Sequence, residues 1–144
     1  MKRYSVVIVA VLAALGAVVV SSNAWAASTV NVALWNDGPD MALKLDKNTV
    51  PAGKVTFKGT NTSVDGTVHE MLVVKVASKH PNLPYNEDTL LVPEDKIKSL
   101  GEIGEINAGD KGGLTIDMKP GTYLLFCNQP GHFAANMKTL FFVK

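Results

Sequence analysis

Residues 123–137 read Tyr-Leu-Leu-Phe-Cys-Asn-Gln-Pro-Gly-His-Phe-Ala-Ala-Asn-Met, an apolar run that passes into a turn. Side chains alternate along a strand, so Tyr123 and Cys127 share a face, and the thiol is expected to point into the end of a core. The Pro-Gly pair before His132 predicts a turn that brings the imidazole back toward the sulfur. Met137 follows before the next apolar run. One loop between two strands therefore carries a thiol, an imidazole and a thioether.

Other stretches of the chain read as short strands separated by turn residues, with no internal repeat. Alternating apolar and polar residues, β-branched runs and breaks at Gly, Pro or Asn predict seven strands. They lie at residues 30–34, 41–45, 54–58, 68–76, 114–118, 123–127 and 139–143. Short strands at this spacing are typical of two packed sheets. The sequence therefore predicts an all-β, antiparallel sandwich.

Residues 79–101 do not fit this pattern, because they are long for a connection between paired strands. Pro93 followed by two acidic residues is typical of a helix start, and Gly101 is placed to end that helix. Ile97 and Leu100, three residues apart, would pack the helix against the sandwich. The sequence predicts a short helical flap over one end or face, with a partner-binding surface as the alternative.

A second histidine, His69, stands at the start of the predicted strand 68–76. With Cys127, His132 and Met137 it completes a set of one thiolate, two imidazoles and one thioether. Soft sulfur ligands and imidazoles favour copper, and two His and one Cys with a weak axial Met are typical of electron-transfer copper sites. A zinc hydrolase is disfavoured, because methionine is a poor zinc ligand and no coordination position is left for water.

Each of these residues also has a structural interpretation. Both faces of strand 68–76 are apolar, so periodicity does not decide which way His69 points. Buried cysteines commonly act as small apolar residues, and Met137 can simply fill core space. His80 is expected to be a surface loop residue. A metal-free adhesion or interaction sandwich, with Cys127 in its core, therefore stays open as an alternative.

Residues 123–137 closely resemble the copper loop of the cupredoxins, the type 1 (blue) copper proteins. The Pro-Gly-His portion is similar to azurin, and the four-residue gap between His132 and Met137 is similar to rusticyanin and sulfocyanin. The resemblance extends in pattern over most of residues 27–144, with a Greek-key order of strands, an upstream histidine and a ligand loop near the C-terminus.

The resemblance implies one mononuclear type 1 copper ion. The implied ligands are three strong donors and one weak axial thioether: His69, Cys127, His132 and Met137. Gln129, two residues after the cysteine, is implied as a backbone donor to the sulfur. Glu70 departs from azurin, which has Asn after the upstream histidine. A carboxylate at this position is expected to lower the reduction potential or make it depend on pH.

The implied function is transfer of single electrons between redox partners by cycling between Cu(I) and Cu(II), rather than catalysis. The electron would pass through the ring edge of His132, and partners would dock near it over Pro130, Phe133, Ala134 and Ala135. Phe133 also has a core position as its alternative interpretation. We expect a monomer. A copper carrier or resistance protein, which binds copper for delivery or sequestration, is the alternative function.

The N-terminal segment predicts export. Two basic residues precede an unbroken apolar run at 6–20, and Ala-Trp-Ala at 24–26 follows. A positive start, a short apolar middle and a small-x-small exit are the parts of a secretory signal peptide. We expect residues 1–26 to be the signal peptide and 27–144 the copper-binding domain, located in the periplasm or another extracytoplasmic space. An uncleaved N-terminal membrane anchor is the alternative.

Composition excludes several other classes. The chain has 14 Lys+Arg and 13 Asp+Glu, and without the two basic residues of the signal segment the balance is 12 − 13 = −1 with no Arg. Such a domain lacks the basic surface that nucleic-acid binding requires. One Cys excludes an internal disulfide and a binuclear copper site, and three His exclude a trinuclear oxidase centre. These counts favour a protein that is not an enzyme.

Overall fold

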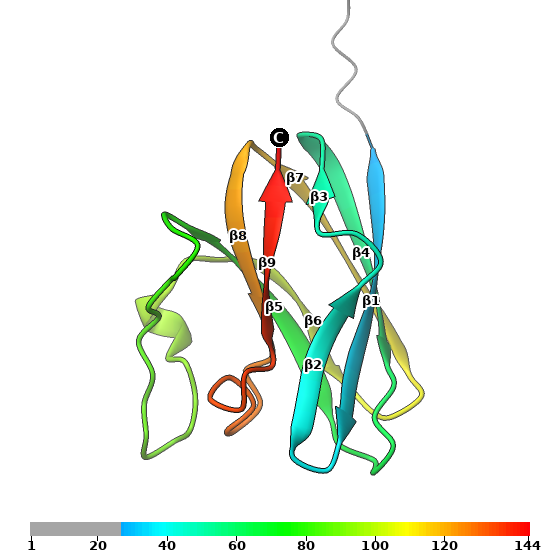
Figure 1. Cartoon of the computed structure of the whole chain (residues 1–144), viewed down its shortest axis with the longest axis vertical. Helices are drawn as coiled ribbons and strands as arrows, with labels where there is room; N and C mark the ends of the chain where they lie inside the picture. The colour runs from blue at the N-terminus through cyan, green and yellow to red at the C-terminus, as the bar shows by residue number, and fades with distance from the viewer. Residues whose placement is uncertain (1–26) are drawn as a thin grey trace, which may run out of the picture.

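In the computed structural model, residues 27–144 are described, and they form nine strands and one short 3-10 helix (Figure 1). The strands are β1 (Ser28–Asp37), β2 (Asp40–Leu45), β3 (Thr49–Val50), β4 (Gly53–Asn61), β5 (His69–Val76), β6 (Ser99–Ile106), β7 (Lys111–Met118), β8 (Gly121–Phe126) and β9 (Lys138–Val143). The helix η1 (Glu94–Lys96) lies between β5 and β6. The expected signal peptide, residues 1–26, lies outside the described residues. Within the described range, no helix is long and apolar enough to cross a membrane.

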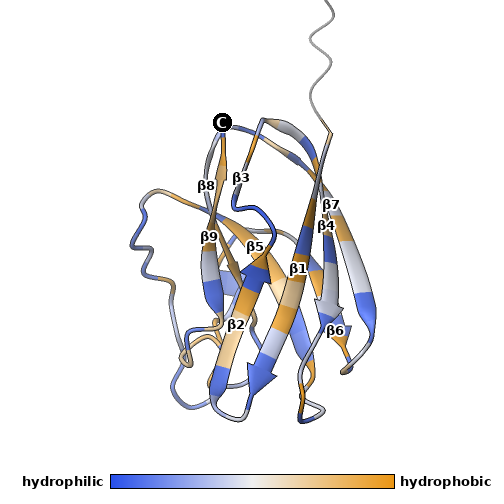
Figure 2. Cartoon of the chain, turned by 45° about the vertical axis from the view of Figure 1, so that its right-hand side comes forward, coloured by the Kyte–Doolittle hydropathy of each residue, from blue (hydrophilic) through white to orange (hydrophobic). Residues whose placement is uncertain are grey.

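Two sheets face each other across an apolar core. One has the strand order β2-β1-β4-β7 and the other β3-β9-β8-β5-β6. Apolar and polar bands follow one another along β1 (Figure 2), and the residues of β4 alternate in burial in the same way. Phe57 of β4 meets Phe141 of β9 edge to face, with ring centroids 5.2 Å apart, and so joins the two sheets. The prediction of an all-β sandwich is confirmed.

The prediction that the strands pair antiparallel is wrong for two pairs of strands. β1 runs parallel to β4, and β3 runs parallel to β9, whereas the other pairs among the described strands are antiparallel. The chain leaves the first sheet after β2, adds β3 to the second sheet, and returns to the first sheet as β4 beside β1. Periodicity indicates which face of a strand is buried and carries no information on strand direction. Mixed pairing therefore does not follow from the sequence pattern.

A strand that the sequence pattern did not predict, β6, forms one edge of the second sheet. Gly101, expected to end the flap helix, instead lies inside β6 opposite Val73, and the helix ends at Lys96. At Gly101 φ is 144°, and a Cβ atom there would lie 2.9 Å from a methyl carbon of Leu114. Backbone conformation and space both favour glycine at this position. The connection between β5 and β6 is therefore residues 77–98, and its helical part is limited to Glu94–Lys96.

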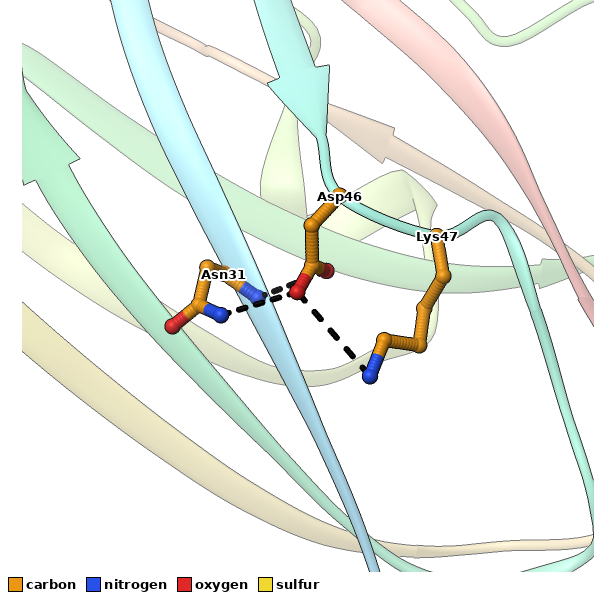
Figure 3. Close-up of polar contacts among 3 residues, drawn as sticks. All are labelled: Asn31, Asp46 and Lys47. Carbon is orange, nitrogen blue, oxygen red and sulfur yellow. Dashed lines mark hydrogen bonds and ion pairs between the residues drawn. The ribbon is translucent and has the colours of Figure 1, made fainter.

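Side-chain contacts join β1 to the residues after β2 at the end of the hairpin opposite its turn (Figure 3). The side-chain amide of Asn31 donates to the Asp46 carboxylate at 2.8 Å, and the Asn31 backbone amide donates to it at 3.0 Å. Lys47 Nζ lies 3.9 Å from the same carboxylate. These contacts follow directly after the last residue pair of the hairpin. They support the register that carries Asn36, near the other end of β1, to the candidate site.

Tyr123 fixes the connection between β7 and β8. Its side chain is 2% exposed, and its hydroxyl donates to the backbone carbonyl of Lys119 at 2.6 Å. A buried tyrosine that bonds back to the chain a few residues upstream is a known device at the corners of β-sandwiches. This contact anchors the start of β8, the strand that leads into Cys127.

Residues 77–98, here called the flap, cover the outer face of the second sheet at the left of Figure 1. Tyr85, Val92 and Ile97 of the flap pack on that face. The residues they cover on β5 and β8 are apolar: Leu72, Val74, Leu124 and Phe126. β5 is therefore buried on both faces, which explains its continuous apolar run. Leu100, expected to help pin the flap, is 37% exposed and belongs to β6.

Candidate metal centre

The four residues singled out by the sequence come from three places in the fold. His69 is the first residue of β5, and Cys127 directly follows the last residue of β8. His132 and Met137 lie in the connection to β9, which we call the ligand loop (residues 127–137). In Figure 1 this loop is the orange to red turn below β9. Because β5 and β8 are paired neighbours, their adjacent ends bring the distant histidine beside the loop.

Three donor atoms of these residues converge. His132 Nδ1 lies 3.3 Å from Cys127 Sγ and 3.3 Å from His69 Nδ1, and the sulfur lies 3.9 Å from His69 Nδ1. His69 and Cys127 are fully buried, whereas His132 is half-buried. Metal–ligand bonds to histidine nitrogen and cysteine sulfur are about 2.0–2.3 Å long, so atoms at this spacing fit around a single ion. The direction in which His69 points, left open by the sequence, is inward.

Hydrogen bonds within the ligand loop hold the fourth residue against the other ligands of the loop. The Cys127 amide donates to the Met137 carbonyl at 3.0 Å, and the Met137 amide donates to the His132 carbonyl at 3.0 Å. The His132 amide closes the Pro-Gly turn on the carbonyl of Gln129 at 2.9 Å, and Gly131 adopts φ of 84°, which favours glycine. Met137 is fully buried. All four residues are thus placed to hold a metal, in a loop that its own backbone fixes.

The cysteine sulfur receives backbone hydrogen bonds. The amide of Glu70 lies 3.5 Å from Cys127 Sγ. Burial raises the pKa of the Cys127 thiol to about 11, while the backbone amides of Glu70 and Gln129 act to lower it. The Gln129 amide is the donor that the cupredoxin resemblance implied. The hydrogen bond from the Glu70 amide could not be predicted from the sequence, because every residue except proline has a backbone N–H donor.

Both imidazoles are held in the neutral form that binds metals. Burial, and then the neighbouring His132, lowers the pKa of His69 to about 4. Burial also lowers the pKa of His132. Metal binding requires neutral histidine and a deprotonated cysteine, so at pH 7 only the thiol has a proton to lose. His80 is exposed on the flap, as expected.

A buried polar residue that the sequence analysis missed contacts the upstream histidine. Asn36 in β1 is fully buried, and its side-chain Oδ1 lies 2.9 Å from His69 Nε2. The residue stands directly before Asp-Gly in the sequence, a pair that is typical of hairpin turns. The sequence therefore indicates a turn residue at this position, and the contact of Asn36 with a candidate ligand is seen only in the fold.

An acidic pocket opens beside the ligand loop. It has a volume of about 370 Å³, and its lining includes the carboxylates of Glu70, Glu94 and Glu105 together with Gln129. The Gln129 side chain donates to Glu105 at 3.0 Å. Burial, followed by repulsion from Glu102, Glu94 and Glu105, raises the pKa of Glu70 to about 7. The departure from azurin at Glu70 thus places a carboxyl group that holds its proton unusually strongly next to His69.

We predict that Glu70→Gln stabilises the metal-free protein more at pH 8 than at pH 5. A carboxyl whose pKa is raised on folding stabilises the fold below its unfolded pKa, and this contribution is lost as pH rises through about 7. Glutamine resembles the protonated form at every pH. Allowing for partial solvent screening, the advantage of the variant should grow by on the order of 1 kcal/mol between these pH values.

Urea unfolding of both proteins at the two pH values measures this difference. Glu87→Gln is a suitable control, because Glu87 is exposed on the flap. An advantage of Glu70→Gln that is the same at pH 5 and pH 8 would contradict the raised pKa.

The flap buries part of the expected docking surface. Phe133 is only 9% exposed; its ring packs against Phe126 with centroids 5.3 Å apart and stacks on Tyr85 at 6.0 Å. Of its two interpretations, the core position is therefore correct. The Gly131 amide also donates to the carbonyl of Leu90 in the flap at 2.8 Å. The exposed residues of the ligand loop are Pro130, Ala134, Ala135 and Asn136, so three of the four residues expected at the docking surface are exposed.

Comparisons with known proteins agree with this fold and site. No family model matches the chain. Over 104 residues the chain is 34% identical to auracyanin-B of Chloroflexus aurantiacus, a match that covers 67% of this chain and 43% of that protein. The chain thus matches less than half the length of this relative.

Solved structures cover the described domain more fully. The structure of auracyanin B is 30% identical, with a TM-score of 0.57, and the match covers 81% of this chain and 88% of that one. Crystal structures of rusticyanin variants are 26% identical, with a TM-score of 0.57, over 81% of this chain and 77% of theirs. With the converging His, Cys and His donors, these matches show that the chain belongs to the cupredoxin family.

Proposed function

We propose that the protein binds one copper ion and transfers single electrons between redox partners. His69, Cys127 and His132 are the proposed strong ligands, and Met137 is the proposed weak axial ligand. The observation that carries the proposal is the convergence of the three donor atoms at 3.3 to 3.9 Å. A thiolate with two imidazoles and a thioether favours copper over zinc. Copper bound there would supply one-electron chemistry by cycling between Cu(I) and Cu(II).

The surrounding residues support electron transfer rather than catalysis. Backbone hydrogen bonds fix the ligand loop, and Asn36 contacts the upstream histidine, so the ligands need little rearrangement when the charge of the centre changes. Outer contacts of this kind are the means by which proteins tune a metal site. His69 and Cys127 are fully buried, which limits access of substrate or water to the centre.

His132 is the proposed exit for the electron. It is the half-buried member of the three converging donors, whereas the other two are shielded from solvent. Pro130, Ala134 and Ala135 are exposed in the same loop and form a small, uncharged surface. Weak redox encounters use small interfaces. We propose that partners dock there, without Phe133, which the flap covers.

Electrochemistry on the copper-loaded protein tests the proposed function. The expected result is a reversible one-electron wave, with copper retained over repeated cycles. A copper carrier would instead release its metal to a chelating acceptor without a change of oxidation state. Rapid loss of copper to such an acceptor, together with an irreversible wave, would overturn electron transfer in favour of a carrier.

Met137→Leu should keep the intense visible colour and raise the reduction potential. Leucine fills similar volume but donates no electron pair, and loss of a weak axial ligand favours the reduced ion. Voltammetry on wild type and variant measures the shift. Met118→Leu is a matched control, because Met118 is equally buried in the core but lies at the far end of β7. A potential unchanged in Met137→Leu would remove Met137 from the ligand set.

We further propose that residues 1–26 direct export and are removed after Ala26. The basic start, the apolar run at 6–20 and the Ala-Trp-Ala exit support this proposal. N-terminal sequencing of the protein recovered from the extracytoplasmic fraction is the test. A mature chain that begins at residue 27 is expected, and one that keeps residues 1–26 would contradict cleavage.

A further inference from the structure

A chain of three side chains runs from the solvent to the candidate metal centre. Asp65 is exposed in the connection between β4 and β5, and its Oδ2 lies 2.7 Å from Asn36 Nδ2. Asn36 Oδ1 lies 2.9 Å from His69 Nε2. The other ring nitrogen of His69, Nδ1, faces Cys127 Sγ and His132 Nδ1. A carboxylate is thus joined through one buried amide to the imidazole of a proposed ligand.

The chemistry of these groups fixes which atom donates at each step. Asp65 also accepts hydrogen bonds from Thr67, at 2.6 Å from the hydroxyl and 3.1 Å from the backbone amide. The hydrogen bonds from Thr67 and then from Asn36 lower the pKa of Asp65 to about 2, so it is an acceptor only at neutral pH. Asn36 must therefore present its NH₂ group to Asp65 and its carbonyl oxygen to His69.

A carbonyl oxygen at 2.9 Å demands a proton on His69 Nε2. A neutral imidazole carries one proton, so Nδ1 is left with its lone pair, aimed at the point where the three donor atoms converge. With the opposite tautomer, Nε2 and the Asn36 oxygen would be two acceptors in contact, and both are fully buried. A buried acceptor without a donor destabilises the fold, which disfavours that tautomer.

We propose that Asp65 and Asn36 are positioning residues that hold His69 in its metal-binding tautomer and place a negative charge behind it. Carboxylates behind metal-ligating histidines orient the ring and raise its basicity. Here an intervening asparagine relays the effect from a carboxylate at the surface. The part of this inference that concerns the reduction potential rests on the proposed copper site, whereas the tautomer does not.

The negative charge of Asp65 lies two hydrogen bonds from His69, through contacts of 2.7 Å to Asn36 and 2.9 Å from Asn36 to the ring. A group that favours positive charge on the ligands also favours the more positive, oxidised metal ion. Removing the charge of Asp65 should therefore raise the reduction potential.

The tautomer is tested by ¹⁵N NMR of the metal-free protein, a readout that requires no copper. We expect the His69 proton on Nε2 in wild type and in Asp65→Asn, whose carbonyl oxygen still accepts from Asn36. In Asn36→Leu the preference should be lost, and copper affinity should fall by about 10- to 100-fold. A wild-type His69 that carries its proton on Nδ1 would overturn the inference, whatever the protein binds.

Voltammetry of Asp65→Asn tests the effect of the Asp65 charge on the reduction potential. The substitution alters an exposed residue and should leave the fold intact. We expect a positive shift of the potential. Asp117→Asn is the matched control, because it removes the same charge from an exposed residue at the far end of β7. Equal shifts in the two variants would contradict a specific role for Asp65. Absence of reversible copper chemistry in wild type would count against the proposed function and leave the NMR result to decide the tautomer.

Discussion

Cys127→Ser should abolish the intense visible absorption of the copper-loaded protein. That absorption depends on a thiolate bound to Cu(II), and a serine hydroxyl is a hard, weakly acidic ligand in its place. The sulfur lies 3.3 Å from the His132 nitrogen and is fully buried. Copper affinity should fall as well, since two imidazoles remain without an anionic partner. Absorption spectra of both proteins with one equivalent of Cu(II) measure the effect.

The Cys127→Ser protein itself should still fold, because the oxygen is smaller than the sulfur and the Glu70 amide remains near it as a donor. Circular dichroism and thermal unfolding of the metal-free variant provide this control. His80→Gln is a second control, because it removes an exposed histidine of the flap and should leave the spectrum unchanged. A folded Cys127→Ser protein that keeps the intense colour would show that the ligand assignment is wrong.

Asn128→Ala should lower the free energy of unfolding by about 2–4 kcal/mol. The Asn128 side chain accepts from the Val92 amide at 2.8 Å and donates to the Val92 carbonyl at 3.0 Å. Both residues are buried, so the alanine variant leaves two backbone groups without a partner. Each such group costs about 1–3 kcal/mol. This loss is a substantial fraction of the roughly 5–15 kcal/mol that stabilises a typical domain.

In Asn128→Ala, local stability should fall first where the flap contacts the ligand loop. Asn128 directly follows Cys127, so its contact with Val92 ties the proposed ligand to the flap. Hydrogen exchange should therefore rise most at the Gly131 amide, which donates to Leu90 of the flap. Asn107→Ala is the control and should cost less than about 0.5 kcal/mol, because Asn107 is exposed and, within residues 27–144, its side chain makes one hydrogen bond, to Asp110 at 3.3 Å. An equally small effect of Asn128→Ala would refute the coupling of flap and loop.

The ligand loop could be predicted from the sequence because its geometry is local. Cys127, His132 and Met137 lie within eleven residues, and a Pro-Gly turn suffices to fold them back on one another. The direction of His69 could not be predicted in this way. The flap buries the outer face of β5, so apolar residues occupy both faces and periodicity carries no information there.

The missed elements also have physical reasons. β6 is an edge strand with mostly exposed residues and two glycines, Gly101 and Gly104, so apolar and polar residues do not alternate along it and only two of its residues are β-branched. β3 is only two residues long. The relay through Asp65 and Asn36 depends on a contact between residues 29 positions apart. Such contacts are set by sheet pairing, which a single sequence does not reveal.

Titration of the metal-free wild-type protein with Cu(II), followed by visible absorption, tests the copper assignment most directly. The convergence of Cys127 Sγ with His69 and His132 predicts an intense band that grows in proportion to added copper and stops at one ion per chain. A spectrum that shows only the weak absorption of copper bound to oxygen and nitrogen, at any ratio, would contradict it.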